Sequence, residues 1–197
     1  MTNVSRKEES IPSSKELVFC VFVGVVFGIV NAEVGAMLMS VMAGLGSQFA
    51  FPLAVFQISQ VFVMYVVRKP GFAFLTMVIN GIVQLLSGSP YGLMTIGFGI
   101  GQGALTELVY ALGRYRHFSW KWNILGAFVA PLGGRVLSIW YQGIPFDFTT
   151  IFWGIFMNMV ASGFESGIIA TLLGRGLYKT GLLRSFRITD TKNTLGW

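Results

Sequence analysis

The sequence is poor in the residues that most often bind metals or form disulfides, with one cysteine, Cys20, and one histidine, His117, among 197 residues. A single cysteine excludes a disulfide within the chain, and the two residues together cannot build a Cys/His metal cluster. The chain also lacks a Walker A sequence, a His-Glu-x-x-His motif and a Gly-x-Ser-x-Gly motif. These absences argue against an ATPase or another enzyme, and we expect no metal and no cofactor.

Charge is also scarce, since only 11% of the residues are charged whereas 54% are hydrophobic. A soluble domain usually has about 25% charged residues. Together with the mean hydropathy of +0.69, this deficit predicts an all-α integral membrane protein that has the lipid bilayer as its solvent. The net charge is +6, but the basic residues stand at the ends of apolar runs. That pattern is typical of membrane topology, and we expect no nucleic-acid partner.

The stretch from Val66 to Gly92 marks both ends of one predicted membrane span, and the other spans are placed relative to it. A charged turn, Arg68-Lys69-Pro70-Gly71, precedes an uncharged run of about one membrane thickness and a second turn at Gly88. Counting outward from it predicts a polar tail (1–16), one six-helix membrane domain (17–175) and a basic tail (176–197). The spans are expected at about 17–32, 53–67, 72–87, 93–113, 122–141 and 151–174, with a lid at 33–51 on the outer surface.

The basic residues orient this bundle. Thirteen of the 14 Lys and Arg residues fall on one side of the predicted topology, and the exception, Arg135, lies within a predicted span. Basic residues collect in cytoplasmic loops. We therefore expect a multi-pass protein of a prokaryotic plasma membrane with both termini in the cytoplasm.

Small residues recur every four positions in the first span, at Cys20, Gly24, Gly28 and Ala32. Such a face lets helix backbones approach closely in lipid. Two interpretations follow: the face packs against a helix of the same chain, or it docks a separate membrane protein.

Ionisable and amide side chains within the spans are the candidate functional residues, because a charge at mid-bilayer costs at least about 2.5 kcal/mol and usually faces a bundle interior or a wet cavity. One interpretation is that Arg135 pairs with Glu165 or Glu33 and only joins helices. The other is a polar cavity, open to the outside, in which aromatic side chains stack on a flat ligand. The substrate-binding residues that we predict are Gln48, Asn80, Gln84, Glu107, Arg135, Trp140, Tyr141, Asn158 and Glu165.

Three motifs resemble the YkoE family. They are Tyr65-x-x-Arg68-Lys69-Pro70-Gly71, the turn Leu86-x-Gly88-x-Pro90-x-Gly92-x-Met94, and Gly99-Ile100-x-Gln102-Gly103-x-x-x-Glu107, followed by the ending Leu172-Leu173-Gly174-Arg175 and Thr180-Gly181. That family comprises substrate-binding S components of energy-coupling factor (ECF) vitamin transporters. The resemblance extends over roughly residues 52–183.

The resemblance implies a six-helix S component that captures thiamin or its hydroxymethylpyrimidine precursor from outside. A transmembrane coupling protein and two cytoplasmic ATPases would be its partners. The resemblance favours the docking role for the face of Cys20, Gly24, Gly28 and Ala32. In the family pattern an acid can stand at the positions of Met77 and Gln84, so this chain departs from it in a way that favours a neutral pyrimidine over cationic thiamin.

Two other functions compete with this expectation. A stand-alone small-solute secondary transporter or channel would use Arg135 and the buried acids for coupling, and would need no ATPase partner. A structural membrane subunit would bind no ligand of its own.

Overall fold

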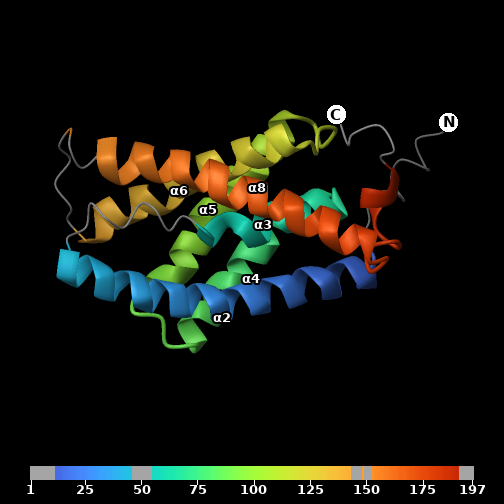
Figure 1. Ribbon diagram of the computed structural model, residues 1–197. Coiled ribbons are helices and arrows are strands. Elements are labelled where there is room, and N and C mark those ends of the chain that lie inside the picture. Colours follow the sequence, from blue (N-terminus) through green and yellow to red (C-terminus); the bar gives the residue numbers. More distant parts are fainter. Residues whose placement is uncertain (1–11, 46–54, 143–147, 149–151, 191–197) are drawn as a thin grey trace.

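Six α-helices make up the bulk of the described chain, which in this computed structural model comprises residues 12–45, 55–142, 148 and 152–190. They are α2 (Ser14–Leu45), α3 (Ile58–Val67), α4 (Phe72–Leu86), α5 (Met94–Leu112), α6 (Trp120–Gln142) and α8 (Asn158–Lys179). Short 3₁₀ turns, η2 (Val55–Gln57) and η4 (Arg187–Asp190), and a π-helical segment, η3 (Phe152–Met157), complete the elements. Figure 1 shows α2, α6 and α8 running lengthwise across the view, with α4 and α5 inclined to them.

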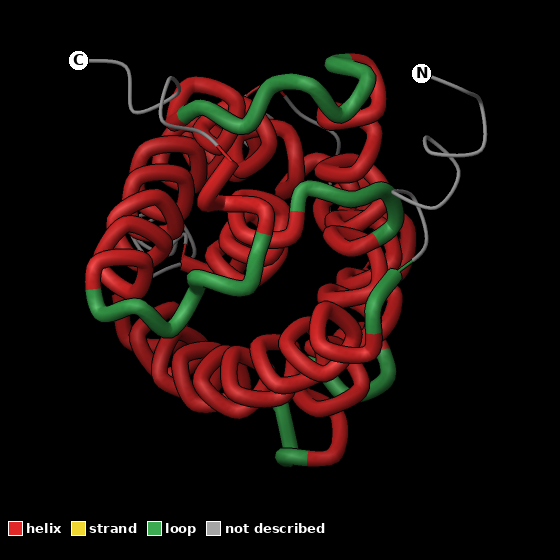
Figure 2. Tube along the Cα trace, turned by 90° about the vertical axis from the view of Figure 1, so that its right-hand side faces the viewer, coloured by secondary structure: helices red, strands yellow, loops and turns green. Residues whose placement is uncertain are grey.

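The helices form a ring in which α2 packs against α4, α4 against α5, α5 against α6 and α6 against α8. Helix α3 lies inside this ring, where it contacts α8, α4, α2 and α6, and all ten of its residues are buried. Figure 2 shows this arrangement along the bundle axis. The central position of α3 explains its apolar sequence, because no face of it meets solvent or lipid.

The basic turns lie together at one end of the bundle, here called the basic end (residues 68–71, 113–119 and 180–187, with the start of α2). Lys69 donates a 2.7 Å hydrogen bond to Glu16, and the guanidinium carbon of Arg68 lies 5.5 Å from the Phe118 ring centroid. Burial opposes ionisation of Glu16, but the hydrogen bonds from Lys69 and Ser13 together with the ammonium charge lower the pKa of its carboxyl group. These contacts hold the start of α2 and the turn before α6 against the turn between α3 and α4.

Helices α4, α5 and α6 begin and end within two residues of the ranges expected for the third, fourth and fifth spans. The expected end of the first helix at Ala32 is wrong, because α2 continues to Leu45. Glycine is tolerated inside helices in apolar surroundings, so Gly35 does not end α2. Of the expected lid, residues 33–45 are therefore part of α2, and 46–51 lie outside the described residues.

Two helices of the described chain, Ser14–Val41 and Ile155–Lys179, are long and apolar enough to cross a membrane. At about 1.5 Å per residue, the 32 residues of α2 span roughly 48 Å, more than the ~30 Å of a hydrocarbon core. Two further apolar helices, Val55–Val67 and Phe72–Leu86, are shorter. The extra length of α2 carries it over the end of the bundle opposite the basic end.

Candidate functional site

A pocket of about 620 Å³ opens at the end of the bundle opposite the basic end. Pockets of this size accommodate small organic ligands. Every α-helix named above except α3 contributes to the wall, together with η2 and the turn between α4 and α5. The lining residues are Leu38, Met39, Phe56, Gln57, Met77, Gln84, Pro90, Tyr91, Gly92, Leu93, Met94, Phe98, Gly99, Gln102, Pro131, Gly134, Arg135, Ser138 and Asn158.

Gln84 is held against the pocket wall by a buried amide network. Its Nε2 donates a 2.6 Å hydrogen bond to Oδ1 of Asn80, one helical turn earlier on α4, and the same oxygen accepts a 3.3 Å bond from Nδ2 of Asn31. Asn80 Nδ2 in turn donates to the hydroxyl of Ser59 at 3.4 Å. Asn80 is completely buried, so it orients Gln84 without itself lining the pocket.

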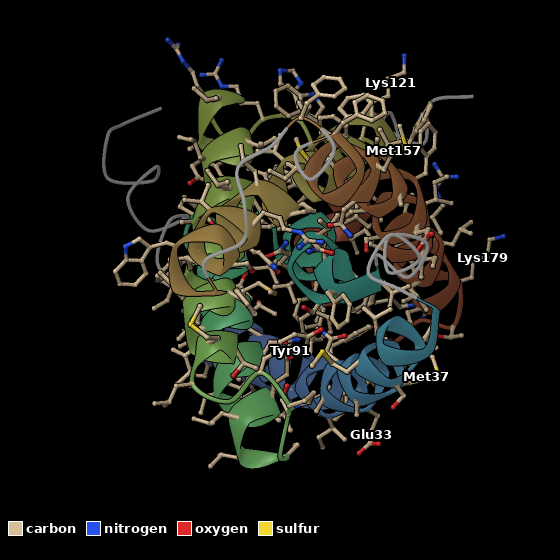
Figure 3. All side chains as sticks on the ribbon, turned by 90° about the vertical axis from the view of Figure 1, so that its left-hand side faces the viewer. Glu33, Met37, Tyr91, Lys121, Met157 and Lys179 are labelled. Atoms are coloured by element: carbon tan, nitrogen blue, oxygen red, sulfur yellow. The ribbon has the colours of Figure 1, made fainter. Side chains whose placement is uncertain are left out.

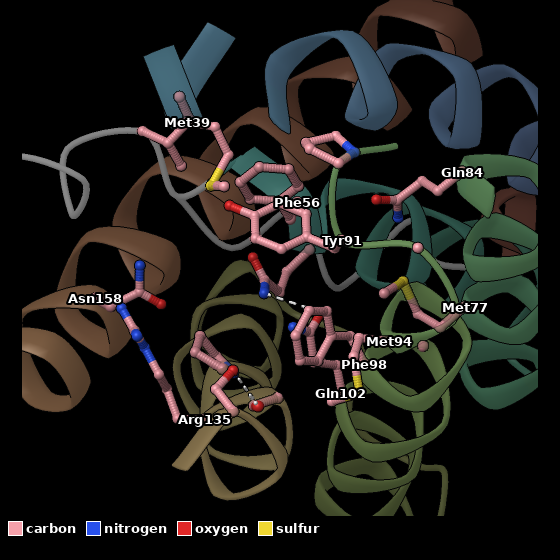
Figure 4. A pocket seen from close by; sticks show the side chains of 18 of the residues that line it. Met39, Phe56, Met77, Gln84, Tyr91, Met94, Phe98, Gln102, Arg135 and Asn158 are labelled. Carbon is pink, nitrogen blue, oxygen red and sulfur yellow. Dashed lines mark hydrogen bonds between the residues drawn. The ribbon is translucent and has the colours of Figure 1, made fainter. Parts of the chain in front are cut away.

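A second pair of amides comes from η2 and α5. Nε2 of Gln57 donates a 3.2 Å hydrogen bond to Oε1 of Gln102 (Figure 4). Behind this pair, the Ser162 hydroxyl lies 3.1 Å from Oε1 of Gln57 and 2.8 Å from the carbonyl oxygen of Ala127. That carbonyl lacks its usual helical partner because Pro131, four residues later, has no N–H. The Ser162 hydroxyl of α8 thus supplies the hydrogen bond that Pro131 of α6 cannot donate to this carbonyl, next to the site.

The absence of a side chain at Gly134 makes room for the Gln102 amide. A Cβ atom built on Gly134 would lie 2.5 Å from Nε2 of Gln102, closer than real Cβ contacts. Gln102 Nε2 therefore occupies the space that any other residue at position 134 would fill. The position needs glycine for this close approach, and the turn of α6 that carries Gly134 also carries Arg135.

Arg135 is the one charged residue among those that line the pocket in the described chain. It is half-buried, and Figure 4 shows its side chain extending beside Asn158 of α8. Within the described residues, no carboxylate forms an ion pair with it. In the interpretation in which Arg135 only joins helices, Glu33 was one possible partner, but Glu33 is exposed and projects from the outside of α2 (Figure 3).

Aromatic rings from three elements face the pocket. Tyr91 and Phe98 form an edge-to-face pair with centroids 5.9 Å apart, and Phe56 of η2 lies near Tyr91 (Figure 4). The Tyr91 ring packs over Gly35 of α2, where a Cβ atom would lie 3.4 Å from it. These rings supply flat surfaces on which a planar ligand can stack.

The predicted site residues therefore separate into several groups. Gln84, Arg135 and Asn158 line the pocket, and Asn80 supports Gln84 from behind. Trp140 is 82% exposed and Glu165 is half-buried, and neither lines the pocket. The side chain of Tyr141, and all of Gln48, lie outside the part of the chain that the structure describes.

Glu107 lies at the basic end, away from the pocket. Its carboxylate accepts hydrogen bonds from the backbone N–H groups of Gly71 (2.6 Å), Ala73 (3.0 Å) and Phe74 (3.4 Å), at the start of α4. The Tyr115 hydroxyl donates a fourth bond of 2.7 Å. Burial and this carboxylate raise the pKa of Tyr115, which keeps it a neutral donor. The geometry gives Glu107 the role of an N-terminal cap for α4.

The small-residue face of α2 is turned inward, against α4. Cβ atoms on Gly24 and Gly28 would lie 2.8 Å from Ile79 Cγ2 and 2.6 Å from Val83 Cβ. Cys20 and Ala32 are buried as well, and Cys20 Sγ lies 3.1 Å from the Thr76 hydroxyl. Of the two interpretations, the structure therefore supports contact within the chain, because this face is not accessible to a separate protein.

Four residues of the pocket wall were not among the predicted substrate-binding residues: Gln57, Gln102, Phe56 and Phe98. Gln102 was recognisable as an amide within a span, but its partner Gln57 stands at the edge of an apolar run and carries no periodic signal. The sequence predicted that aromatic side chains stack on a flat ligand, without assigning Phe56 or Phe98 to that role. The contacts that select Phe56 and Phe98 join elements that are distant in sequence, and only the fold brings them together.

Comparison with known proteins first defines the class. The chain superposes on a crystal structure of an S-component of an ECF transporter with a TM-score of 0.87, over 91% of this chain and 92% of that one, at 21% identity. This chain therefore has the S-component fold. S components are substrate-binding transporter subunits rather than enzymes.

The family follows from sequence. Residues 15–133, which are 119 of the 197, match the family described as "ABC-type cobalt transport system, permease component". The chain belongs to this family of membrane proteins. It is also 29% identical over 184 residues, 88% of each chain, to YkoE of Bacillus subtilis (strain 168), described as a candidate HMP/thiamine permease protein. The resemblance drawn from the motifs around Arg68, Gly88 and Glu107 is thereby confirmed.

Proposed function

We propose that this chain is the substrate-binding S component of an ECF-type vitamin importer and that its ligand is a pyrimidine of the thiamin pathway, either hydroxymethylpyrimidine or thiamin. The observation that carries the proposal is the combination of the amides of Gln84, Gln102 and Gln57 with aromatic rings around one pocket. Amide groups match the ring nitrogens and exocyclic amine of an aminopyrimidine, and aromatic rings stack on its faces.

The same wall favours the neutral pyrimidine over thiamin. In the described residues that line the pocket, neither Asp nor Glu is present to balance the thiazolium charge, and Arg135 would repel it. The neutral hydroxymethylpyrimidine carries no such penalty. A cobalt ion, which the description of the family mentions, is also a poor match for amide oxygens, thioethers and a guanidinium, because divalent transition metals prefer imidazole, thiolate and carboxylate ligands.

The proposed topology places the pocket outside and the basic end in the cytoplasm. Lys69, Arg68 and the basic residues after α8 would then follow the positive-inside rule, with a multi-pass chain and both termini inside. Energy would come from a transmembrane coupling protein and two ATPases. The basic end would face these partners, since it is the cytoplasmic surface in this orientation.

Isothermal titration of the purified full chain in detergent tests the binding role. The proposal predicts saturable, one-to-one binding of hydroxymethylpyrimidine without ATP, weaker binding of thiamin, and an affinity loss of about tenfold or more in Gln84→Ala. The absence of heat with both compounds would overturn the substrate assignment.

Proteoliposomes distinguish the importer subunit from a stand-alone transporter. The chain alone is expected to bind labelled hydroxymethylpyrimidine but not to accumulate it, whereas addition of the coupling protein and ATPases restores uptake. Uptake by the chain alone would instead identify a secondary transporter or channel.

A further inference from the structure

We propose that Ser162 is a positioning residue that fixes the orientation of the Gln57 and Gln102 amides, so that a carbonyl oxygen faces the ligand and selects a 4-aminopyrimidine over a 4-oxopyrimidine. This inference rests on the proposed function and specifies how that site chooses its substrate. Gln57 and Gln102 line the pocket, whereas Ser162 is fully buried and is not among the residues of the wall.

The Ser162 hydroxyl has two oxygens within hydrogen-bonding distance but only one proton to donate. Its Oγ lies 2.8 Å from the carbonyl oxygen of Ala127 and 3.1 Å from Oε1 of Gln57. Residue 131, which would normally donate to the Ala127 carbonyl, is a proline and has no N–H. Because a buried carbonyl without a donor is costly, and because its distance is the shorter, we assign the Ser162 proton to Ala127.

The Gln57 amide must then donate to Ser162, because the hydroxyl oxygen can only accept. A half-turn about the last bond of a glutamine exchanges its nitrogen and oxygen in place, and the hydrogen-bond network decides between the two orientations. The Gln57 nitrogen therefore belongs beside Ser162, and its oxygen belongs beside Gln102. The 3.2 Å contact between the two amides is kept with Gln102 as the donor, in the reverse sense to the bond drawn in Figure 4.

A second buried hydroxyl of α8 already has the arrangement that we assign to Ser162. Oγ1 of Thr171 donates to the carbonyl oxygen of Gly167 at 2.8 Å and accepts a 2.8 Å hydrogen bond from Nδ2 of Asn123. Its single proton goes to a backbone carbonyl, and a side-chain amide nitrogen supplies the other bond. Thr171 does not line the pocket, so it offers a matched control.

The orientation of Gln102 decides what the pocket offers to a pyrimidine. The end of this amide that does not contact Gln57 lies next to Gly134, another residue of the wall. In the assigned orientation that end is an oxygen, which accepts a hydrogen bond from the exocyclic amine of a 4-aminopyrimidine. A 4-oxopyrimidine would place a second acceptor against it, with no proton between them. A glutamine that is free to turn would bind either ring, so the selectivity comes from the fixed orientation.

The test is isothermal titration of the purified full chain with two matched probes: hydroxymethylpyrimidine, which carries a 4-amino group, and its 4-oxo analogue. The amine is expected to bind about tenfold or more tightly than the oxo compound. In Ser162→Ala the Gln57 amide is free to turn, so the ratio of the two affinities should fall toward one. Ser162→Thr keeps the hydroxyl and should retain the ratio. Thr171→Val removes a buried α8 hydroxyl outside the pocket and should leave the ratio unchanged.

Pro131→Ala tests the cause of the orientation. The new N–H at position 131 would donate to the Ala127 carbonyl and release the Ser162 proton for Gln57, so the ratio should fall here as well. Thermal unfolding verifies that each variant is folded, and Pro131→Ala provides the reading if Ser162→Ala does not fold.

Two results would overturn the fixed orientation and leave the proposed function standing. One is an oxo analogue that binds the unmodified chain as tightly as the amine or more tightly. The other is a ratio that stays unchanged in folded Ser162→Ala, or that falls equally in folded Ser162→Thr. Binding of neither probe to the unmodified chain would overturn both the orientation and the proposed function.

Discussion

The amide nitrogen of Gln84 donates a 2.6 Å hydrogen bond to Oδ1 of Asn80, so a pocket residue is oriented by a fully buried residue one turn away. The same oxygen receives Nδ2 of Asn31, and the Asn80 nitrogen reaches Ser59. One asparagine therefore connects α2, α3 and α4 directly behind the pocket wall. Ligand binding and the stability of the bundle should be coupled through it.

Replacing Asn80 with alanine should affect both properties. Asn31, Gln84 and Ser59 would lose a partner inside the protein, and unsatisfied buried polar groups cost about 1–3 kcal/mol. We expect Asn80→Ala to lower the thermal midpoint and to weaken hydroxymethylpyrimidine binding. Gln84→Ala, at the pocket surface, should weaken binding with a smaller loss of stability. An unchanged thermal midpoint in Asn80→Ala would contradict the role of this network.

The close approach of Gly134 to Gln102 predicts a specific defect. In Gly134→Ala the new methyl group would displace the Gln102 amide and disturb its hydrogen bond with Gln57. Binding should weaken by about tenfold, the effect of losing one well-placed hydrogen bond. Gly97→Ala is the control, because its Cβ would meet only Leu137 at an ordinary 3.5 Å. Equal affinities in the two variants would show that Gln102 does not bind the ligand.

The packing of α2 on α4 gives a prediction about stability. Gly28→Ala would bring a methyl group within 2.6 Å of Val83 Cβ, and such overpacking typically costs about 1–3 kcal/mol. The thermal midpoint should fall. Gly44→Ala is the control, because a Cβ atom at Gly44 would meet open space. Its thermal midpoint should not fall, since alanine favours the helix over glycine. A fully stable Gly28→Ala protein that failed to co-purify with its coupling protein would instead support the docking role.

Glu107 should matter for stability and not for binding. Glu107→Gln removes the charge that accepts three backbone N–H groups at the start of α4, and we expect a loss of about 1–2 kcal/mol. Affinity for hydroxymethylpyrimidine should remain within about twofold. Glu33→Gln, at an exposed acid, is the control for the loss of one negative charge. Titration calorimetry and thermal unfolding on the same samples measure both effects, and a selective loss of binding would return Glu107 to the substrate site.

Helix positions could be predicted well where local signals mark both ends. Pro70-Gly71 begins α4, and apolar length fixes the extent of α5 and α6. The continuation of α2 beyond Ala32 could not be predicted, because glycine and methionine in residues 33–45 indicate a break in water but are compatible with helix in a packed or apolar setting. The short α3 owes its boundaries to its place at the centre of the ring.

The site was predictable only in part, for a related reason. The rule that polar residues inside apolar runs are costly unless they serve a purpose predicted Gln84, Arg135 and Asn158, and these three line the pocket. That rule does not say to which end of the bundle a polar residue points, and Glu107 satisfies it by capping α4. Trp140 is 82% exposed and does not line the pocket, because an aromatic residue at a helix end can face lipid as readily as a pocket.

The most direct test of the central claim is a crystal structure of the chain purified with hydroxymethylpyrimidine. We expect ligand density in the pocket, with the pyrimidine hydrogen-bonded to Gln84 or Gln102 and stacked on Tyr91, Phe98 or Phe56. Ligand density outside this pocket, for example at the basic end near Glu107, with the pocket itself unoccupied, would contradict it.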